Sequence, residues 1–247
     1  MSCWDRFDRK FLLTVPSSNR RSGFLNSAEK LGLSVETYYN PIVKIESIGC
    51  KRINAVRTLM EDPARVSCNL GHYRIIKTAL GLGANNVLVF EDDARFLKDK
   101  NAISDIIDSM PEDYDVALLD SVNPKNVDPK EMYEEIKRNE IKKWWYSLPS
   151  SPRSFCAYAM SRRGMEWFIG CYDYVFDGKP RGMWRLCDGF LKKGCRDSRL
   201  MYCCCIPRIA IQASFDDAMS RDHRDVNAQR MRYSLLGSDI DDYDMAP

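Results

Sequence analysis

The stretch Asn86-Val-Leu-Val-Phe-Glu-Asp-Asp-Ala-Arg95 decides the fold and contains the most informative side chains. Its apolar part, residues 87–90, is a short β-branched and aromatic run of the kind that forms a buried strand. Three consecutive carboxylates, Glu91, Asp92 and Asp93, follow at the carboxyl end of that strand. Because ligands of open α/β sheets bind at this end of the strands, we expect the functional site here.

The spacing of the carboxylates predicts how they divide. If the strand stays extended, Glu91 and Asp93 project to one face and Asp92 to the other, so Glu91 and Asp93 could share a cation. Carboxylate oxygens favour Mg²⁺ or Mn²⁺, and three neighbouring negative charges need such an ion or basic partners to offset them. The residues alone leave a second interpretation open, in which Asp93 begins a helix and the acids stabilise its N-terminus.

Strands and helices alternate on both sides of this stretch. The predicted strands cover residues 11–15, 35–38, 115–119, 155–160 and 200–206, and the predicted helices cover 24–31, 70–80 and 103–110, with another after Ser161. This alternation indicates an α/β fold with a mainly parallel sheet flanked by helices on both faces. We assign residues 1–236 to a single domain and 237–247 to an acidic C-terminal tail.

Residues 123–154 interrupt the alternation and are predicted as an insertion or flap over the site. A mixed-charge helix is expected from Lys130 to Lys143, followed by the aromatic residues Trp144, Trp145 and Tyr146. These rings could stack on a sugar, could make a peripheral contact with a membrane surface, or could be buried residues of the flap.

Composition excludes several classes of protein. The 37 basic and 35 acidic residues give a net charge of +2, which argues against a nucleic-acid binder. The ten cysteines include no CxxC pair and the N-terminal residues are charged, so neither a zinc ribbon nor a secreted disulfide framework is expected. No apolar stretch approaches the roughly 18 residues of a membrane span. We expect a cytoplasmic protein with reduced thiols, in which Cys203 to Cys205 belong to a buried strand.

Several segments, in order along residues 11–222, resemble one enzyme family. They are Phe11-Leu-Leu-Thr-Val15 followed by Arg20 and Arg21, Val66-Ser-Cys-Asn-Leu-Gly-His-Tyr-Arg74, Asn86 to Ala94, Ala157-Tyr-Ala-Met-Ser-Arg-Arg-Gly164, Asp188-Gly-Phe-Leu191, and Cys205-Ile-Pro207 through Gln212 to Ser220. Together they resemble the signature of glycosyltransferase family 25, the lipooligosaccharide and collagen galactosyltransferase-like group. Gly71 stands where the family usually has Ser, Ser67 where it has Gly, and Thr14-Val15 where it has Asn-Leu.

The resemblance implies a GT-A type, Rossmann-like glycosyltransferase domain. Such an enzyme transfers a sugar such as galactose from a nucleotide-diphosphate donor, commonly UDP-linked, to a glycan or glycolipid acceptor, with inversion and with Mn²⁺ or Mg²⁺. By the same resemblance Asp93, Glu91 and His223 bind the metal, Asp188 is the catalytic base, and Asp92 is also catalytic. The residues expected to bind the donor are Thr14, Val15, Pro16, Arg20, Arg21, His72, Arg74, Glu91 and Asp92.

Taken one at a time, these residues allow simpler roles. Asp188 could cap a following helix, His72 could be a hydrogen-bonded structural histidine, and His223 could be a solvated loop residue. Arg20 and Arg21 could be ordinary surface arginines. Two other functions also stay open: a metal-dependent phosphotransferase or nucleotidyltransferase that uses the same acidic strand end, and a glycan-binding protein that keeps the fold without turnover.

Overall fold

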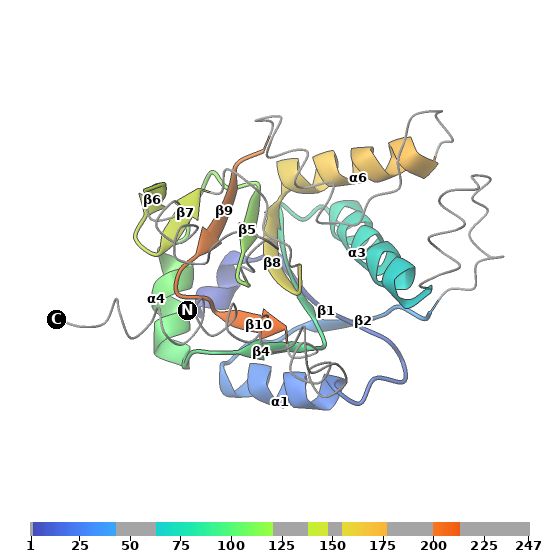
Figure 1. Cartoon of the computed structure of the whole chain (residues 1–247), viewed down its shortest axis with the longest axis horizontal. Coiled ribbons are helices and arrows are strands. Elements are labelled where there is room, and N and C mark those ends of the chain that lie inside the picture. The colour runs from blue at the N-terminus through green and yellow to red at the C-terminus, as the bar shows by residue number, and fades with distance from the viewer. Residues whose placement is uncertain (1, 43–62, 121–137, 148–154, 177–199, 213–247) are drawn as a thin grey trace, which may run out of the picture.

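The computed structural model describes residues 2–42, 63–120, 138–147, 155–176 and 200–212, which form a sheet with helices on both faces (Figure 1). In chain order the elements are η1 (Cys3–Arg6), β1 (Arg9–Thr14), α1 (Arg21–Lys30), β2 (Glu36–Tyr39), α3 (Pro63–Gly81), β3 (Asn86–Glu91), β4 (Ala94–Phe96), α4 (Lys100–Asp108), β5 (Val116–Leu118), β6 (Glu140–Lys142), β7 (Trp145–Ser147), β8 (Ala157–Ser161), α6 (Arg162–Phe176), β9 (Tyr202–Cys205) and β10 (Ala210–Gln212). The α/β class predicted from the alternation of elements is confirmed.

The large sheet has eight strands in the order β2-β1-β3-β8-β5-β9-β7-β6, and β4 pairs separately with β10. Strand β1 is parallel to β2 and β3, and β5 is parallel to β9. Strands β8 and β7 run against their neighbours, so four of the seven pairings in this sheet are antiparallel. The sheet is therefore mixed, but the parallel pairings expected to dominate it are slightly outnumbered. Strands β6 and β7 are antiparallel because a tight turn joins them, and β8 runs against both of its neighbours.

Each central strand is buried on both faces, which explains its continuous apolar sequence. In β3, Val87 and Val89 face a core cluster that contains residues of α3 and α6, whereas Leu88 and Phe90 face a second cluster with residues of η1, α1 and α4. The helices therefore cover opposite faces, with α3 and α6 on one and α1 and α4 on the other (Figure 1). This arrangement makes β3 the centre of three layers.

Local signals in the sequence define several ends of the helices. After α1 the chain turns at Gly32, whose φ of +69° favours glycine, and Gly83 adopts a φ of +77° after α3. Helix α4 begins after Asp99, whose carboxylate accepts a hydrogen bond of 2.9 Å from the backbone N–H of Ala102. Among the described residues, no helix combines the length and apolar character needed to cross a membrane.

The described part of the predicted insertion is a hairpin, β6 and β7, that extends the sheet beyond β9. Residues 140–142 are therefore a strand, and the helix expected up to Lys143 is wrong at this end. Trp145 is fully buried and its Nε1 donates a 2.8 Å hydrogen bond to the carbonyl of Ile106, and Tyr146 is also buried. The buried alternative thus holds for these two rings, while the other insertion residues, 123–137 and 148–154, lie outside the described residues.

The cysteine triplet forms β9, as predicted. Cys203 and Cys205 pack into the cluster on the α1 side, and Cys204 packs into the cluster on the α3 side. Burial raises the pKa of all three thiols, that of Cys205 to about 12. These cysteines therefore serve as small apolar residues of the core.

Candidate functional site

The site forms where β1 and β3 end side by side. The two strands are parallel, with Leu13 opposite Glu91, so the chain leaves both strands at the same edge of the sheet. The backbone N–H of Asp92 donates a 3.1 Å hydrogen bond to the carbonyl of Leu13, which continues the pairing one residue beyond β3. The loop after β1, which leads into α1, therefore lies next to the carboxylates.

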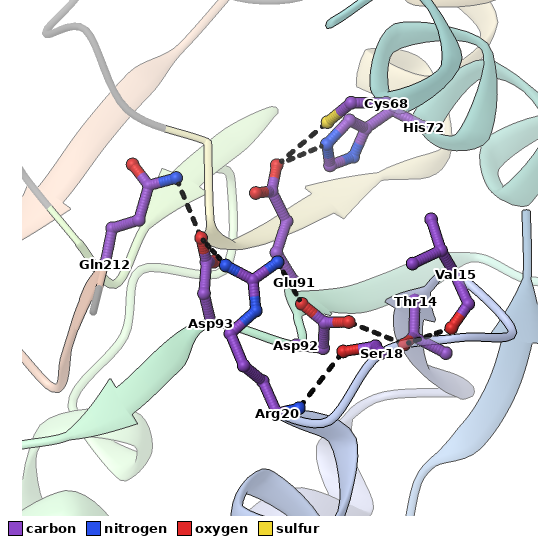
Figure 2. Close-up of polar contacts among 10 residues, drawn as sticks. All are labelled: Thr14, Val15, Ser18, Arg20, Cys68, His72, Glu91, Asp92, Asp93 and Gln212. Carbon is purple, nitrogen blue, oxygen red and sulfur yellow. Dashed lines mark hydrogen bonds and ion pairs between the residues drawn. The ribbon is translucent and has the colours of Figure 1, made fainter. Parts of the chain in front are cut away.

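Asp92 and Asp93 share one cationic partner, the guanidinium of Arg20 (Figure 2). Arg20 Nη2 lies 3.1 Å from Asp92 Oδ1, and Nη1 lies 3.6 Å from Asp93 Oδ2. Thr14 Oγ1 donates a 2.6 Å hydrogen bond to the other oxygen of Asp92. Both carboxylates are buried, whereas the Arg20 side chain is 44% exposed. One partly exposed positive charge thus faces two buried negative charges, which leaves the group with a net charge of −1.

Glu91 turns to the other side of β3. Its Oε1 lies 2.8 Å from His72 Nε2 and accepts a 3.4 Å hydrogen bond from Cys68 Sγ (Figure 2). Glu91 and Asp92 therefore alternate as predicted, but Asp93 does not return to the face of Glu91 because extended geometry stops at Glu91. The carboxylates of Glu91 and Asp93 contact different partners on opposite sides of the strand, so the pairing expected from an extended triplet is wrong.

The alternative that Asp93 begins a helix is also wrong. The chain makes a tight turn at residues 92 and 93 and enters strand β4 at Ala94. Strand β4 pairs with β10, which places Gln212 opposite Ala94. From there Gln212 Nε2 donates a 3.1 Å hydrogen bond to Asp93 Oδ2 (Figure 2). Gln212 is a site residue that sequence reasoning did not assign, although it lies in one of the segments that carry the family resemblance.

A pocket of about 390 Å³ opens beside these carboxylates. Its walls come from the start of α1, with Arg20, Ser22 and Ser27, and from the turn after β3, with Asp92, Asp93 and Arg95. The pocket therefore lies at the carboxyl end of the sheet, where the sequence predicts the site.

The other residues predicted to bind a donor divide into two groups. Val15 and Pro16 belong to the turn next to Thr14, where the carbonyl of Val15 accepts a 3.0 Å hydrogen bond from the N–H of Ser18 and lies 3.2 Å from Thr14 Oγ1. Arg21 instead turns toward β2 and donates a 3.1 Å hydrogen bond to the hydroxyl of Tyr39. Only the first group adjoins Asp92.

Arg74 supports the loop after β2. Its Nη1 donates a 2.9 Å hydrogen bond to Asn40 Oδ1, while Asn40 Nδ2 donates to the carbonyl of Ser67 at 2.6 Å. The backbone N–H of Asn40 also donates to the carbonyl of Thr14 at 2.8 Å. Arg74 thus acts on the site indirectly, by fixing the chain that borders β1. Asp188 and His223 lie outside the described residues.

Gly71 lies where α3 packs closely against the end of β1. A Cβ at this position of α3 would lie 2.7 Å from a methyl group of Leu13 and 3.1 Å from Asn40 Nδ2. A larger residue would therefore press on the side chains of Leu13 and Asn40, which would have to shift. Glycine lets α3 approach β1 closely here, next to His72, whose imidazole contacts Glu91 of β3.

Cys156 lies next to the site, and its thiol is buried. Its backbone carbonyl accepts a 2.8 Å hydrogen bond from the N–H of Glu91. Burial raises the pKa of its thiol well above the ordinary value, and the negative charges of Asp120, Glu91 and Asp93 raise it further. The Cys156 thiol is therefore protonated at neutral pH, which makes it a weak nucleophile.

Comparisons with known proteins do not identify the chain. No protein-family model matches it, and no curated protein matches it in sequence.

Proposed function

We propose that the protein is a glycosyltransferase of the GT-A type that uses a nucleotide-diphosphate sugar as donor and a divalent cation. One observation carries the proposal: two buried carboxylates, Asp92 and Asp93, converge on Arg20 beside a pocket at the carboxyl ends of β1 and β3. The ordered segments that resemble family 25 support the same function, including the Thr14 and Gln212 segments that adjoin these carboxylates.

The donor atoms at this position suit Mn²⁺ or Mg²⁺. Asp92 and Asp93 supply oxygens only, and the guanidinium between them marks a place where positive charge is stabilised. When bound, a divalent cation offsets the charge that develops on the leaving diphosphate. In the proposed site Asp92 and Asp93 hold that cation, with Thr14 and Gln212 fixing the orientation of the two carboxylates.

Arg20 exchanges partners in this scheme. Without donor its single positive charge offsets part of the negative charge of the two carboxylates, and its side chain is 44% exposed. In the proposed scheme the guanidinium leaves the carboxylates when the cation and donor bind. A guanidinium released there can form a bidentate contact with phosphate oxygens. Transfer also needs a carboxylate base for the acceptor hydroxyl, and Asp188 remains our candidate for that role.

A panel of nucleotide sugars tests the proposal. We expect one donor, with Mn²⁺, to raise the melting temperature of the wild type and to be hydrolysed or transferred. Asp93→Asn should lose both effects, because the substitution removes the charge and keeps the shape. The control Glu112→Gln changes an exposed acid outside the site and should behave as the wild type. Equal stabilisation and turnover in Asp93→Asn, or no response of the wild type to any donor, would contradict the proposal.

Binding without turnover would favour the glycan-binding alternative instead. Release of free phosphate or transfer of a nucleotidyl group, detected in the same reactions by phosphorus NMR, would favour the phosphotransferase or nucleotidyltransferase alternative. The products therefore separate the three functions.

A further inference from the structure

A second group of ligand atoms lies on the α3 side of β3 (Figure 2). Cys68 Sγ, His72 Nε2 and a carboxylate oxygen of Glu91 all lie within 4.8 Å of one another. Cys68 and His72 are four residues apart on α3, so their side chains lie on one face of the helix, and Glu91 meets them from the end of β3. Two regular elements therefore hold the three donor atoms together.

The chemistry of this set differs from that of Asp92 and Asp93. Thiolate and imidazole favour Zn²⁺ and related transition metals, whereas Mg²⁺ favours oxygen. The bond lengths of a tetrahedral zinc site space neighbouring ligand atoms roughly 3.3–3.6 Å apart. Cys68 Sγ already lies 3.4 Å from Glu91 Oε1, and the 2.8 Å between His72 Nε2 and the same oxygen is a hydrogen bond that a small rotation of Glu91 would open.

The surroundings of His72 suit a metal ligand. Its Nδ1 lies 3.1 Å from the hydroxyl oxygen of Tyr158, which can accept a hydrogen bond from Nδ1–H in the tautomer whose unprotonated Nε2 binds a metal. The ring of Phe155 contacts the imidazole edge-on at 5.2 Å and stacks on Tyr158 at 3.6 Å. The imidazole is therefore held in one orientation, while the Glu91 side chain is 18% exposed and gives access from solvent.

We propose that Cys68, His72 and Glu91 form a Zn²⁺-binding site, separate from the carboxylates of Asp92 and Asp93. Three protein ligands leave one tetrahedral position for water or a substrate atom. The ion joins α3 to the end of β3 and offsets the charge of Glu91. This inference rests on the donor atoms alone and is independent of the glycosyltransferase proposal.

Cobalt substitution tests the site, because Co²⁺ takes the same ligands and reports thiolate bonding by an absorption band in the near ultraviolet. The full chain is stripped with a chelator, freed of it and titrated with Co²⁺ alone. We expect one equivalent of Co²⁺ to produce the thiolate band and Zn²⁺ to abolish it. Cys68→Ser should lose the band, and His72→Gln should weaken Co²⁺ binding about tenfold or more.

Two control variants make the result specific. Cys171→Ser removes a partly buried cysteine of α6, and Asp93→Asn alters the other side of β3, so both should keep the band. His72 is buried and its substitution can disturb folding, which circular dichroism will reveal. Cys68 is only partly buried and serine has nearly its shape, so Cys68→Ser decides the test. A wild type without the band, or a band that survives in Cys68→Ser, would overturn the proposal.

Discussion

The two sides of β3 carry carboxylates from the same triplet, but these carboxylates contact different kinds of side chain. On the α1 side, Asp92 and Asp93 contact a half-exposed arginine next to a pocket. On the α3 side, Glu91 contacts a buried histidine and a cysteine beneath a packed helix. A strand buried on both faces therefore delivers consecutive acids to two sites, one suited to oxygen-binding cations and phosphate, the other to a transition metal.

The largest expected effect is on the α1 side. Asp92→Asn keeps the acceptor for Thr14 but removes the charge that faces Arg20. We expect donor turnover with Mn²⁺ to fall about a thousandfold, the upper range for loss of one group that stabilises developing charge. Steady-state kinetics will measure the loss, and the cobalt–thiolate band of this variant should stay. Near-normal turnover in Asp92→Asn would remove this side of β3 from the reaction.

Two substitutions of Arg20, also on the α1 side of β3, separate the contribution of its charge to turnover from that of its guanidinium geometry. Arg20→Ala should lower turnover about a hundredfold, because the donor loses a phosphate contact. Arg20→Lys should recover only part of the loss, since an ammonium group cannot make the bidentate contact with phosphate oxygens that a guanidinium makes. A full rescue by lysine would show that only the charge matters.

Alkaline unfolding tests how strongly burial suppresses ionisation of the Cys205 thiol in β9, in contrast to the partly buried Cys68. Burial raises the pKa of Cys205 from 9.0 to about 12, so its stabilising effect is complete below pH 9 and is lost as the pH rises toward 12. Between pH 9 and 11, Cys205→Ala should lose about 2 kcal/mol less unfolding free energy than the wild type. Denaturant titrations at both pH values will show this. An equal loss in both proteins would mean that the thiol ionises readily in the fold.

The smallest expected effects come from two glycine substitutions, which compare the packing of α3 with the packing of α1. Gly71→Ala on α3 meets Leu13 and Asn40, and should lower the free energy of unfolding by about 1–2 kcal/mol. Gly23→Ala on α1 meets no atom within 4 Å, and should be neutral or stabilising by about 0.5–1 kcal/mol because alanine favours helix. Denaturant unfolding measures both variants. Equal effects would mean that α3 is not pressed against β1 as described.

Much of this arrangement follows from local sequence. Strict alternation along β3 predicts the opposite directions of Glu91 and Asp92, because an extended chain buried on both faces has no other choice. Asp93 departs because the pairing that keeps the chain extended ends at Glu91, and the turn that follows depends on a partner strand 119 residues away, at Gln212. The periodicity of the sequence cannot predict that two strands so far apart in the chain will pair.

The hairpin at Trp145 also depends on distant pairing. The mixed charges before it predict a helix, and the aromatic residues allow either a binding surface or a buried flap. Strand β7 instead pairs with the edge of β9, and the ring of Trp145 is buried. Cys68 was likewise missed, because its partners His72 and Glu91 come together only through the packing of α3 on β3. The sequence pattern placed the carboxylates at the end of a buried strand, and tertiary contacts decided their geometry.

The most direct test of the account is the electron paramagnetic resonance of Mn²⁺ titrated into the protein with UDP, GDP, ADP or dTDP. We predict that one nucleotide tightens Mn²⁺ binding by the wild type at least about tenfold, and that Asp93→Asn abolishes this gain. Glu112→Gln should match the wild type. If no nucleotide tightens Mn²⁺ binding, or if Asp93→Asn shows the same gain as the wild type, the carboxylates beside Arg20 are not the donor site.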